Sequence, residues 1–333
     1  MRPTLSFLLA VTTAIVLLAA GLVAPAWLLF LITLSASNGL AVLGIVVLMR
    51  GGGATFGQGM FFALGAYTAV LAPTYLGIHD ALMRTLLGTL VAGLIGAVIA
   101  PLLVRYRGIF FAMLTLALSM VLFGLLSKLT VLGGSDGISA IKPTVFGMKL
   151  EGGNAEYIMY CLTTVIAVAA GWAVSVYWNS AAGLMALAVR GNPLRVEYLG
   201  ASASRSLGTS FFICSLLGGA GGALAAQSLG HVEPNFTNWT TSGEFVFVAV
   251  LAGYKRVPAV FVASLLLEVV RSFSNLYFPN TWQLALGVFL LLVILFRPDG
   301  IGSLWAAPRR RKPLMARPVA AAAAVASGAE NRP

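Results

Sequence analysis

Long apolar runs, separated by short polar connections, recur along the whole chain. A membrane-spanning helix needs about 20 mostly apolar residues. The pattern predicts ten apolar segments, of which the eighth is too short to cross a bilayer alone. We therefore predict an all-α polytopic membrane protein with about 9–10 transmembrane helices. The predicted segments are residues 5–23, 27–49, 56–76, 85–104, 109–126, 157–178, 206–229, 245–252, 258–272 and 282–296.

Two regions of the pattern depart from simple spanning helices. Residues 50–59, RGGGATFGQG, contain too many glycines for a stable helix end. Residues 245–272 are interrupted by GYKRVP, which leaves two short apolar halves. Non-helical backbone at membrane depth must be buried in protein or line a cavity, and broken helices are typical of transport proteins. The pattern leaves open whether 245–272 forms two spans or a re-entrant hairpin.

Composition and charge agree with a membrane protein and predict its orientation. Hydrophobic residues make up 59% of the chain and charged residues only 9%, although the net charge is +11. With alternating spans and a cytoplasmic N-terminus, most of the 21 Lys and Arg residues fall on the cytoplasmic side, as the positive-inside rule requires. Only Arg84, Lys128, Lys142, Lys149 and Arg271 fall on the outer side.

The same alternation predicts how the chain is divided. Residues 1–305 form one transmembrane domain, with outer loops at 133–156 and 231–244, a cytoplasmic connection at 179–206 and a cytoplasmic C-terminus. Residues 306–333 are basic and then alanine-rich, and we interpret them as a disordered cytoplasmic tail. Within the spans, Gly218 with Gly222 is a small-xxx-small pair of the kind that allows close helix packing.

The connection 179–206 has the capping signals of two short helices joined by a turn. Ser180 is a suitable N-cap for the first helix, and Gly191 is a suitable stop. Asn192 followed by Pro193 starts a second helix, which Gly200 ends. A compact helix-turn-helix between two spans suits docking on a soluble partner. The alternative is a solvated connection with incidental caps.

Residues 133–137, GGSDG, match the G-x-S-x-G nucleophile pattern, but they lie in a predicted outer loop rather than on a strand-to-helix turn. Other motifs for catalysis are missing from the sequence. It has no GxxxxGK[ST] loop, no HExxH and no CxxC, and no cluster of acids, histidines or amines lies at one depth. The only acid well inside a predicted span is Glu268, three residues before Arg271 and so spaced for an intrahelical pair. A pathway without buried charge clusters fits a transport subunit that receives its energy and its selectivity from other proteins.

Several ordered motifs make the chain resemble the LivM-type permease subunits of bacterial ABC importers for branched-chain amino acids. The resemblance covers about residues 27–305. It rests on GQGMFFALGAYT at 57–68, RYRGIFFAMLTLA at 105–117, GGSDGI at 133–138 and LALGVFLLLVILFRPDGIGSL at 284–304. Its fifth part is the family's coupling pattern, matched by Gly183, Ala188, Arg190, Asn192, Glu197, Leu199 and Gly200.

The chain departs from the family pattern at a few positions. Leu184 and Leu187 stand where the family usually has further arginines, and Pro193 stands where it has an acid. Near Gly253 the family has G-G-x-G, whereas this chain reads GYKRV.

The resemblance implies a permease subunit in the bacterial inner membrane that translocates leucine, isoleucine or valine. Its implied partners are a homologous second permease, two P-loop ATPases that bind ATP and Mg, and a periplasmic solute-binding protein. This chain itself is then expected to bind no cofactor or metal and to catalyse no reaction. Two alternatives remain: a permease of the same family for urea or another small amide or amino acid, and a stand-alone secondary carrier or channel with Glu268 in its pathway.

The resemblance and the local patterns together give the candidate site residues. Contact with the ATPase subunits is expected at Gly183, Ala188, Arg190, Asn192, Arg195, Glu197 and Gly200. Candidate pathway residues are Gly57, Gln58, Gly59, Tyr67, Thr115 and Glu268.

Overall fold

The computed structural model describes residues 3–145, 148–149, 154–277, 284, 287–288, 291, 295 and 300–303. Eleven α-helices run through these residues, and seven of the described helices are long and apolar enough to cross a membrane. The fold is therefore an all-α polytopic membrane protein, as predicted. The helices are α1 (Pro3–Gly21), α2 (Ala26–Arg50), α3 (Gln58–Leu76), α4 (Ala81–Leu103), α5 (Ile109–Lys128), α6 (Asn154–Asn179), α7 (Ala181–Gly191), α8 (Pro193–Tyr198), α9 (Ala203–Leu229), α10 (Trp239–Ala252) and α11 (Val257–Tyr277).

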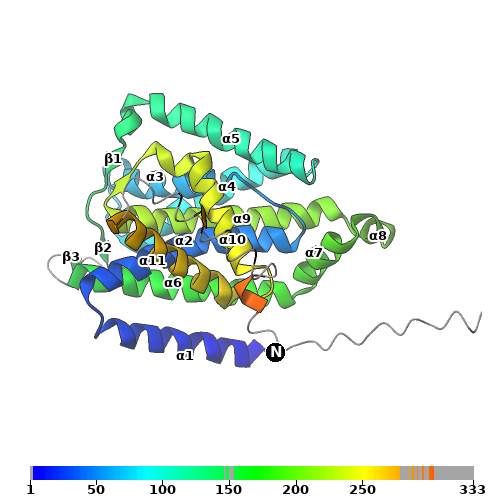
Figure 1. The fold of residues 1–333 in the computed structure, drawn as a ribbon. Helices are drawn as coiled ribbons and strands as arrows, with labels where there is room; N and C mark the ends of the chain where they lie inside the picture. The colour runs from blue at the N-terminus through cyan, green and yellow to red at the C-terminus, as the bar shows by residue number, and fades with distance from the viewer. Residues whose placement is uncertain are drawn as a thin grey trace, which may run out of the picture.

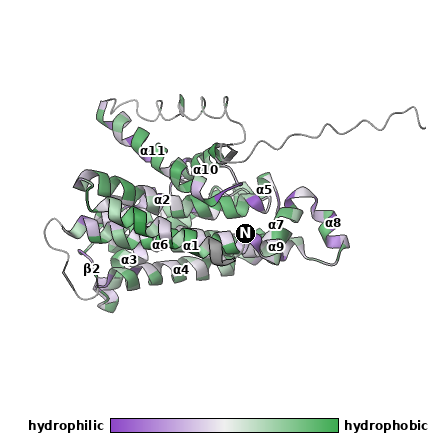
Figure 2. Ribbon diagram, turned by 90° about the horizontal axis from the view of Figure 1, so that it is seen from below, coloured by the Kyte–Doolittle hydropathy of each residue, from purple (hydrophilic) through white to green (hydrophobic). Residues whose placement is uncertain are grey.

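Most helices run along one common direction, which gives the bundle two ends (Figure 1). The two short helices α7 and α8 lie at one end, called here the α8 end, and the described strands lie at the other, the strand end. Figure 2 shows apolar residues along the length of the bundle helices. The short elements are β1 (Ile138–Ser139), β2 (Thr144–Val145), β3 (Met148–Lys149), β4 (His231–Val232) and the 3₁₀ turns η1 (Thr130–Leu132), η2 (Gly134–Asp136), η3 (Pro234–Thr237) and η4 (Ile301–Ser303).

Helices α2 and α9 form the centre of the bundle. In the most apolar 18-residue stretch of each helix, 78% of the residues of α2 and 72% of those of α9 are buried. The corresponding shares are 28% for α4 and 22% for α5. Glycines let α9 approach its neighbours closely, because a Cβ built on Gly222 would overlap the carbonyl oxygen of Phe62. Gly218 likewise packs against Gln58 and Phe61. The small-xxx-small pair predicted at 218 and 222 therefore serves helix packing.

The glycine-rich segment after α2 is a partly buried, non-helical stretch. Gly51, Gly53, Thr55 and Gly57 are buried. The backbone N–H groups of Phe56 and Gly57 donate to the hydroxyls of Thr115 and Thr55 at 3.3 and 3.1 Å. Helix α3 begins only after this stretch. Its first residue, Gln58, contacts Cys214 near the middle of α9. The irregular backbone is thus buried at alternate residues, while Gly52 and Ala54 are exposed.

The second break also occurs where the sequence predicts it. Helix α10 ends at Ala252, Gly253 follows with φ of +70°, and α11 begins at Val257. Helix α10 has 14 residues, too few to cross about 30 Å of hydrocarbon at 1.5 Å per residue. Helix α11 has 21 residues and is long enough. The segment 245–272 thus contains the end of a short helix and most of a helix of spanning length.

Several predicted boundaries were wrong by a few residues. Helix α4 begins at Ala81 rather than 85, because Asp80 caps it by accepting from the N–H groups of Leu82 and Met83. Helices α6 and α10 begin inside the loops predicted at 133–156 and 231–244. The predicted segment 282–296 lies outside the described residues except at five positions, and the predicted tail 306–333 lies outside them entirely.

Candidate functional site

The connection between α6 and α9 folds as the capping signals predict. The Ser180 hydroxyl accepts from the N–H of Gly183 at 3.4 Å and begins α7. The Asn192 side chain accepts from the N–H of Arg195 at 3.0 Å and begins α8. Gly200 has φ of +84°, a left-handed conformation that suits glycine. One detail differs from the prediction: Gly191 is the last helical residue of α7, and the extended Asn192 ends that helix.

Large apolar side chains of this connection face away from the bundle. Tyr198 is 88% exposed, Leu199 81% and Leu194 63%. Leu184 and Leu187 of α7 are exposed as well, while Gly183, Ala186 and Val189 form the buried face of that helix. Since the connection projects beyond the ends of the long helices (Figure 1), this apolar surface is available to a partner.

Arg190 joins the connection to the end of α2 and to the α10–α11 turn. Its guanidinium lies 3.6 Å from the ring centroid of Tyr254, in the turn between α10 and α11. It also donates to the carbonyl oxygen of Met49 near the end of α2, at 3.3 Å. Next to this contact, the guanidinium of Arg50 lies 4.6 Å from the ring centroid of Trp178 at the end of α6. Arg190 therefore contacts both the end of α2 and the α10–α11 turn.

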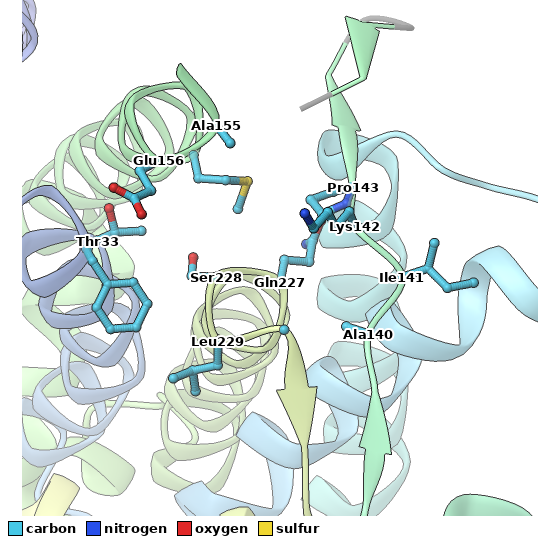
Figure 3. Close-up of a pocket in the computed structure, with 13 residues that line it drawn as sticks. Thr33, Ala140, Ile141, Lys142, Pro143, Ala155, Glu156, Gln227, Ser228 and Leu229 are labelled. Atoms are coloured by element: carbon cyan, nitrogen blue, oxygen red, sulfur yellow. The ribbon is translucent and has the colours of Figure 1, made fainter. Parts of the chain in front are cut away.

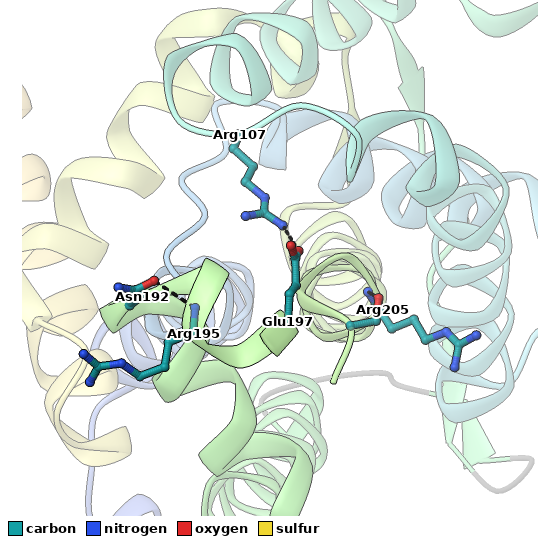
Figure 4. Close-up of polar contacts among 6 residues, drawn as sticks. Arg107, Asn192, Arg195, Glu197 and Arg205 are labelled. Atoms are coloured by element: carbon teal, nitrogen blue, oxygen red, sulfur yellow. Dashed lines mark hydrogen bonds and ion pairs between the residues drawn. The ribbon is translucent and has the colours of Figure 1, made fainter. Parts of the chain in front are cut away.

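Glu197 joins α8 to the short loop between α4 and α5. Its carboxylate lies 3.0 Å from Nη2 of Arg107, and Figure 4 shows this pair beside the Asn192 cap. In the same view the side chain of Arg205, near the start of α9, points away from the pair. The coupling pattern thus contains two residues that contact the bundle: Glu197 contacts the α4–α5 loop, and Arg190 contacts the end of α2 and the α10–α11 turn.

We expect Glu197→Gln to leave the stability of the protein nearly unchanged. The two side chains of the pair are 42% and 46% exposed, and exposed ion pairs contribute about 0–1 kcal/mol. The melting temperature of the purified chain should shift by no more than about 2 °C. Differential scanning fluorimetry in detergent would measure it, with Glu233→Gln as the matched control. A larger shift would mean that this pair fixes α8 on the bundle.

Four of the candidate pathway residues meet inside the subunit. Gln58 donates to the carbonyl oxygens of Ala41 and Cys214 at 2.9 and 3.3 Å. The N–H of Gly59 donates to the hydroxyl of Ser242 at 3.0 Å, and Gly57 packs against the backbone of Thr115. These residues connect the starts of α3 and α10 with α2, α5 and α9. They are buried, and they line neither the cavity beside Lys142 and Glu156 nor the one beside Arg205 and Phe212.

The two other candidate pathway residues lie apart from this group. Tyr67 is 5% exposed and packs in an apolar cluster near the strand end. Glu268 of α11 is also buried, and it accepts from the Asn38 side chain of α2 at 3.3 Å. Arg271 reaches Glu244 of α10 at 3.4 Å. The acid predicted to lie inside a span therefore belongs to a polar contact between α2, α10 and α11.

Comparison with known proteins identifies the family. The family described as "Branched-chain amino acid transport system / permease component" matches residues 27–295. The chain belongs to this family. The match begins with α2 and extends past α11. It therefore contains the glycine-rich segment, the α7–α8 connection and the break between α10 and α11.

Two curated members of the family are similar to this chain. Each is named high-affinity branched-chain amino acid transport system permease protein LivM. The protein from Salmonella typhimurium is 29% identical and that from Escherichia coli 28% identical, each over 278 residues. The alignment covers 77% of this chain and 65% of each relative, so it spans less than two thirds of their length. No solved structure shows significant similarity to the chain.

The structure adds residues to the site that sequence reasoning missed. Tyr254 and Arg107 contact Arg190 and Glu197 of the connection, and Asn38 donates to Glu268. Tyr254 and Arg107 lie next to a glycine turn and in an arginine-rich loop, two regions that the sequence already marked. The contact between Asn38 and Glu268 had one signal in the sequence: Asn38 is a polar residue within an apolar run.

Proposed function

We propose that this chain is the permease subunit of an ATP-driven importer that moves leucine, isoleucine and valine into the bacterial cell. It lies in the inner membrane with both termini in the cytoplasm, so the α8 end faces the cytoplasm. It works with a homologous second permease, two P-loop ATPases and a periplasmic solute-binding protein. It binds no cofactor itself, because ATP and Mg are held by the ATPases.

The observation that carries this proposal is the exposed α7–α8 connection. In the bilayer the apolar faces of the long helices are covered by lipid or by another permease, whereas α7 and α8 project beyond them. Leu194, Tyr198 and Leu199 would then face water unless a soluble partner covered them. Membership of the permease family supports an ATPase as that partner.

The proposed mechanism follows from the contacts of the connection. ATP-driven closure of the ATPases pushes on α8 and α7. Arg190 passes this movement to Met49 in the last turn of α2 and to Tyr254 between α10 and α11. Since α2 is the most buried long helix of the bundle, its displacement changes the packing of the whole subunit. The transported solute then passes along the permease without being held by a buried charge cluster.

The first test is whether the apolar tip of the connection recruits the ATPases. We expect Tyr198→Asp to reduce the ATPases that co-purify in mild detergent at least tenfold, because it places a charge in a desolvated contact. Tyr75→Asp is the matched control, since Tyr75 is 66% exposed at the strand end. Equal ATPase recovery with both variants would contradict the proposal that α8 binds the ATPases.

The second test concerns energy and solute. Vesicles containing the co-purified complex should take up labelled leucine only with ATP and binding protein present, and isoleucine and valine should compete. Uptake that follows a proton gradient and ignores ATP would contradict the importer. Competition by urea or a simple amide, but not by isoleucine, would keep the importer and change its substrate.

A further inference from the structure

A cavity at the strand end of the bundle is lined by groups that complement a small ligand with one positive and one negative charge. It has a volume of about 240 Å³ and lies between α2, α6, the end of α9 and the extended segment 140–143. Pockets for drug-sized ligands occupy about 300–1,000 Å³, so this cavity suits a smaller solute. It is separate from the α7–α8 connection and from the buried residues around Gln58.

The charged groups of the cavity stand on opposite sides. Figure 3 shows Glu156 of α6 on one side near Thr33, and Lys142 of the extended segment on the other near Pro143. Both side chains are exposed, and no ion pair within the described part of the chain uses either of them. A cation and an anion held apart across a cavity match the two charges of an α-amino acid.

The segment that carries Lys142 is fixed by hydrogen bonds on both sides. Ala140 donates its N–H to the carbonyl oxygen of Gly230 at 2.8 Å, and Thr144 donates its N–H to the carbonyl oxygen of His79 at 2.9 Å. Nη1 of Arg84 donates to the carbonyl oxygen of Ile141 at 3.0 Å, and Arg84 is fully buried. Lys142 is therefore presented from a fixed backbone, which makes it a suitable partner for a ligand.

The base of the cavity supplies a further polar group and an apolar wall. Gln227 is 4% exposed, and its amide nitrogen donates to Thr85 and to the carbonyl oxygen of Ala223. Those bonds fix the amide, while its oxygen has no hydrogen-bond partner within the described residues. Phe30, Met159 and Leu229 line the cavity with apolar surface. An aliphatic side chain would pack there.

We propose that this cavity is an outer-side binding site for a zwitterionic amino acid with an apolar side chain. Lys142 receives the carboxylate, Glu156 receives the ammonium group, and the side chain packs on Phe30, Met159 and Leu229. The site rests on the proposed function for its place on the outer side and for its solute class. It gives the released amino acid a first position on the permease before it enters the bundle.

The test measures binding of labelled L-leucine to the full-length chain in detergent, together with competition by two leucine analogues. Leucinamide lacks the carboxylate, and 4-methylpentanoate lacks the ammonium group. The wild-type protein should bind leucine at least tenfold more tightly than either analogue. Lys142→Gln should weaken leucine binding about tenfold and abolish the preference over leucinamide only. Glu156→Gln should abolish the preference over 4-methylpentanoate only.

Three control variants keep the result specific. Lys128→Gln and Glu233→Gln remove the same charges from positions outside the cavity and should leave binding and both preferences unchanged. Lys142→Arg should retain binding, which separates loss of charge from loss of folding. Wild-type preferences that persist in both cavity variants would overturn the proposal, as would a wild-type chain that binds no leucine.

The outcome is distinguishable from failure of the importer. ATP-dependent uptake by the complex, with no binding at this cavity, would overturn the site and leave the proposed function intact. Leucine binding that depends on Lys142 and Glu156, in a chain that recruits no ATPase, would keep the site and overturn the importer.

Discussion

Arg190→Glu is expected to abolish ATP-driven uptake while the protein remains folded in the membrane. The substitution reverses the charge that lies 3.6 Å from the Tyr254 ring centroid and removes the bond to the Met49 carbonyl oxygen. A carboxylate is repelled by the negative face of an aromatic ring and by a carbonyl oxygen, so α7 loses both of these links to the bundle. Uptake should fall to background, because ATP-driven movement of α7 no longer reaches α2.

The measurement is leucine uptake into vesicles, with the amount of membrane-inserted protein determined in parallel. Arg190→Lys is the matched control, since a lysine keeps a cation over the ring and should retain part of the activity. Tyr254→Leu should lower uptake in the same direction by removing the ring alone. Normal uptake by Arg190→Glu would show that these two contacts do not transmit the movement.

Gly222→Ala is expected to remove most of the folded protein from the membrane. The added methyl group would overlap the carbonyl oxygen of Phe62 in α3, and a backbone atom cannot move aside as a flexible side chain can. Helices α3 and α9 would have to separate, which opens the packed core on both sides of α9. The loss should exceed the usual cost of overpacking, about 1–3 kcal/mol, because backbone rather than a side chain is displaced.

The measurement is the monodisperse yield and the melting temperature of the purified chain. Gly124→Ala in α5 is the matched control, because a Cβ at Gly124 meets no atom within 4 Å. The control should be neutral or slightly stabilising, since alanine favours a helix more than glycine does. Similar yields for the two variants would contradict the close packing of α3 on α9.

Much of the helical framework followed from the sequence. Apolar run length located the spanning helices, and the glycine-rich and GYKRVP segments located the two breaks. The caps at Ser180 and Asn192 formed as expected because capping depends on residues three positions apart. The boundary errors arose where a local cap was overlooked, as at Asp80, or where polar residues belong to a helix, as at the start of α10.

The candidate site followed from the sequence only in part. Resemblance to the permease family marked Arg190 and Glu197, but their partners Tyr254 and Arg107 are 64 and 90 positions away in the sequence. No periodic pattern carries information over such a distance. The strand-end cavity had no sequence signal either, because Lys142, Glu156 and Gln227 come from three segments that only folding brings together.

The sequence by itself determined that this chain crosses the membrane many times, where its two helix breaks lie and to which family it is similar, because those properties depend on composition and on short-range patterns. Tertiary structure alone decided which face of α7 is buried against the bundle. In α7, both Leu184 with Leu187 and Gly183 with Ala186 have helical spacing, yet the small residues are buried and the leucines are exposed. Gly183 fits against the end of α6 where a Cβ would overlap the carbonyl oxygen of Tyr177. Space between helices, rather than hydrophobicity, therefore decided which surface of the connection is left for a partner.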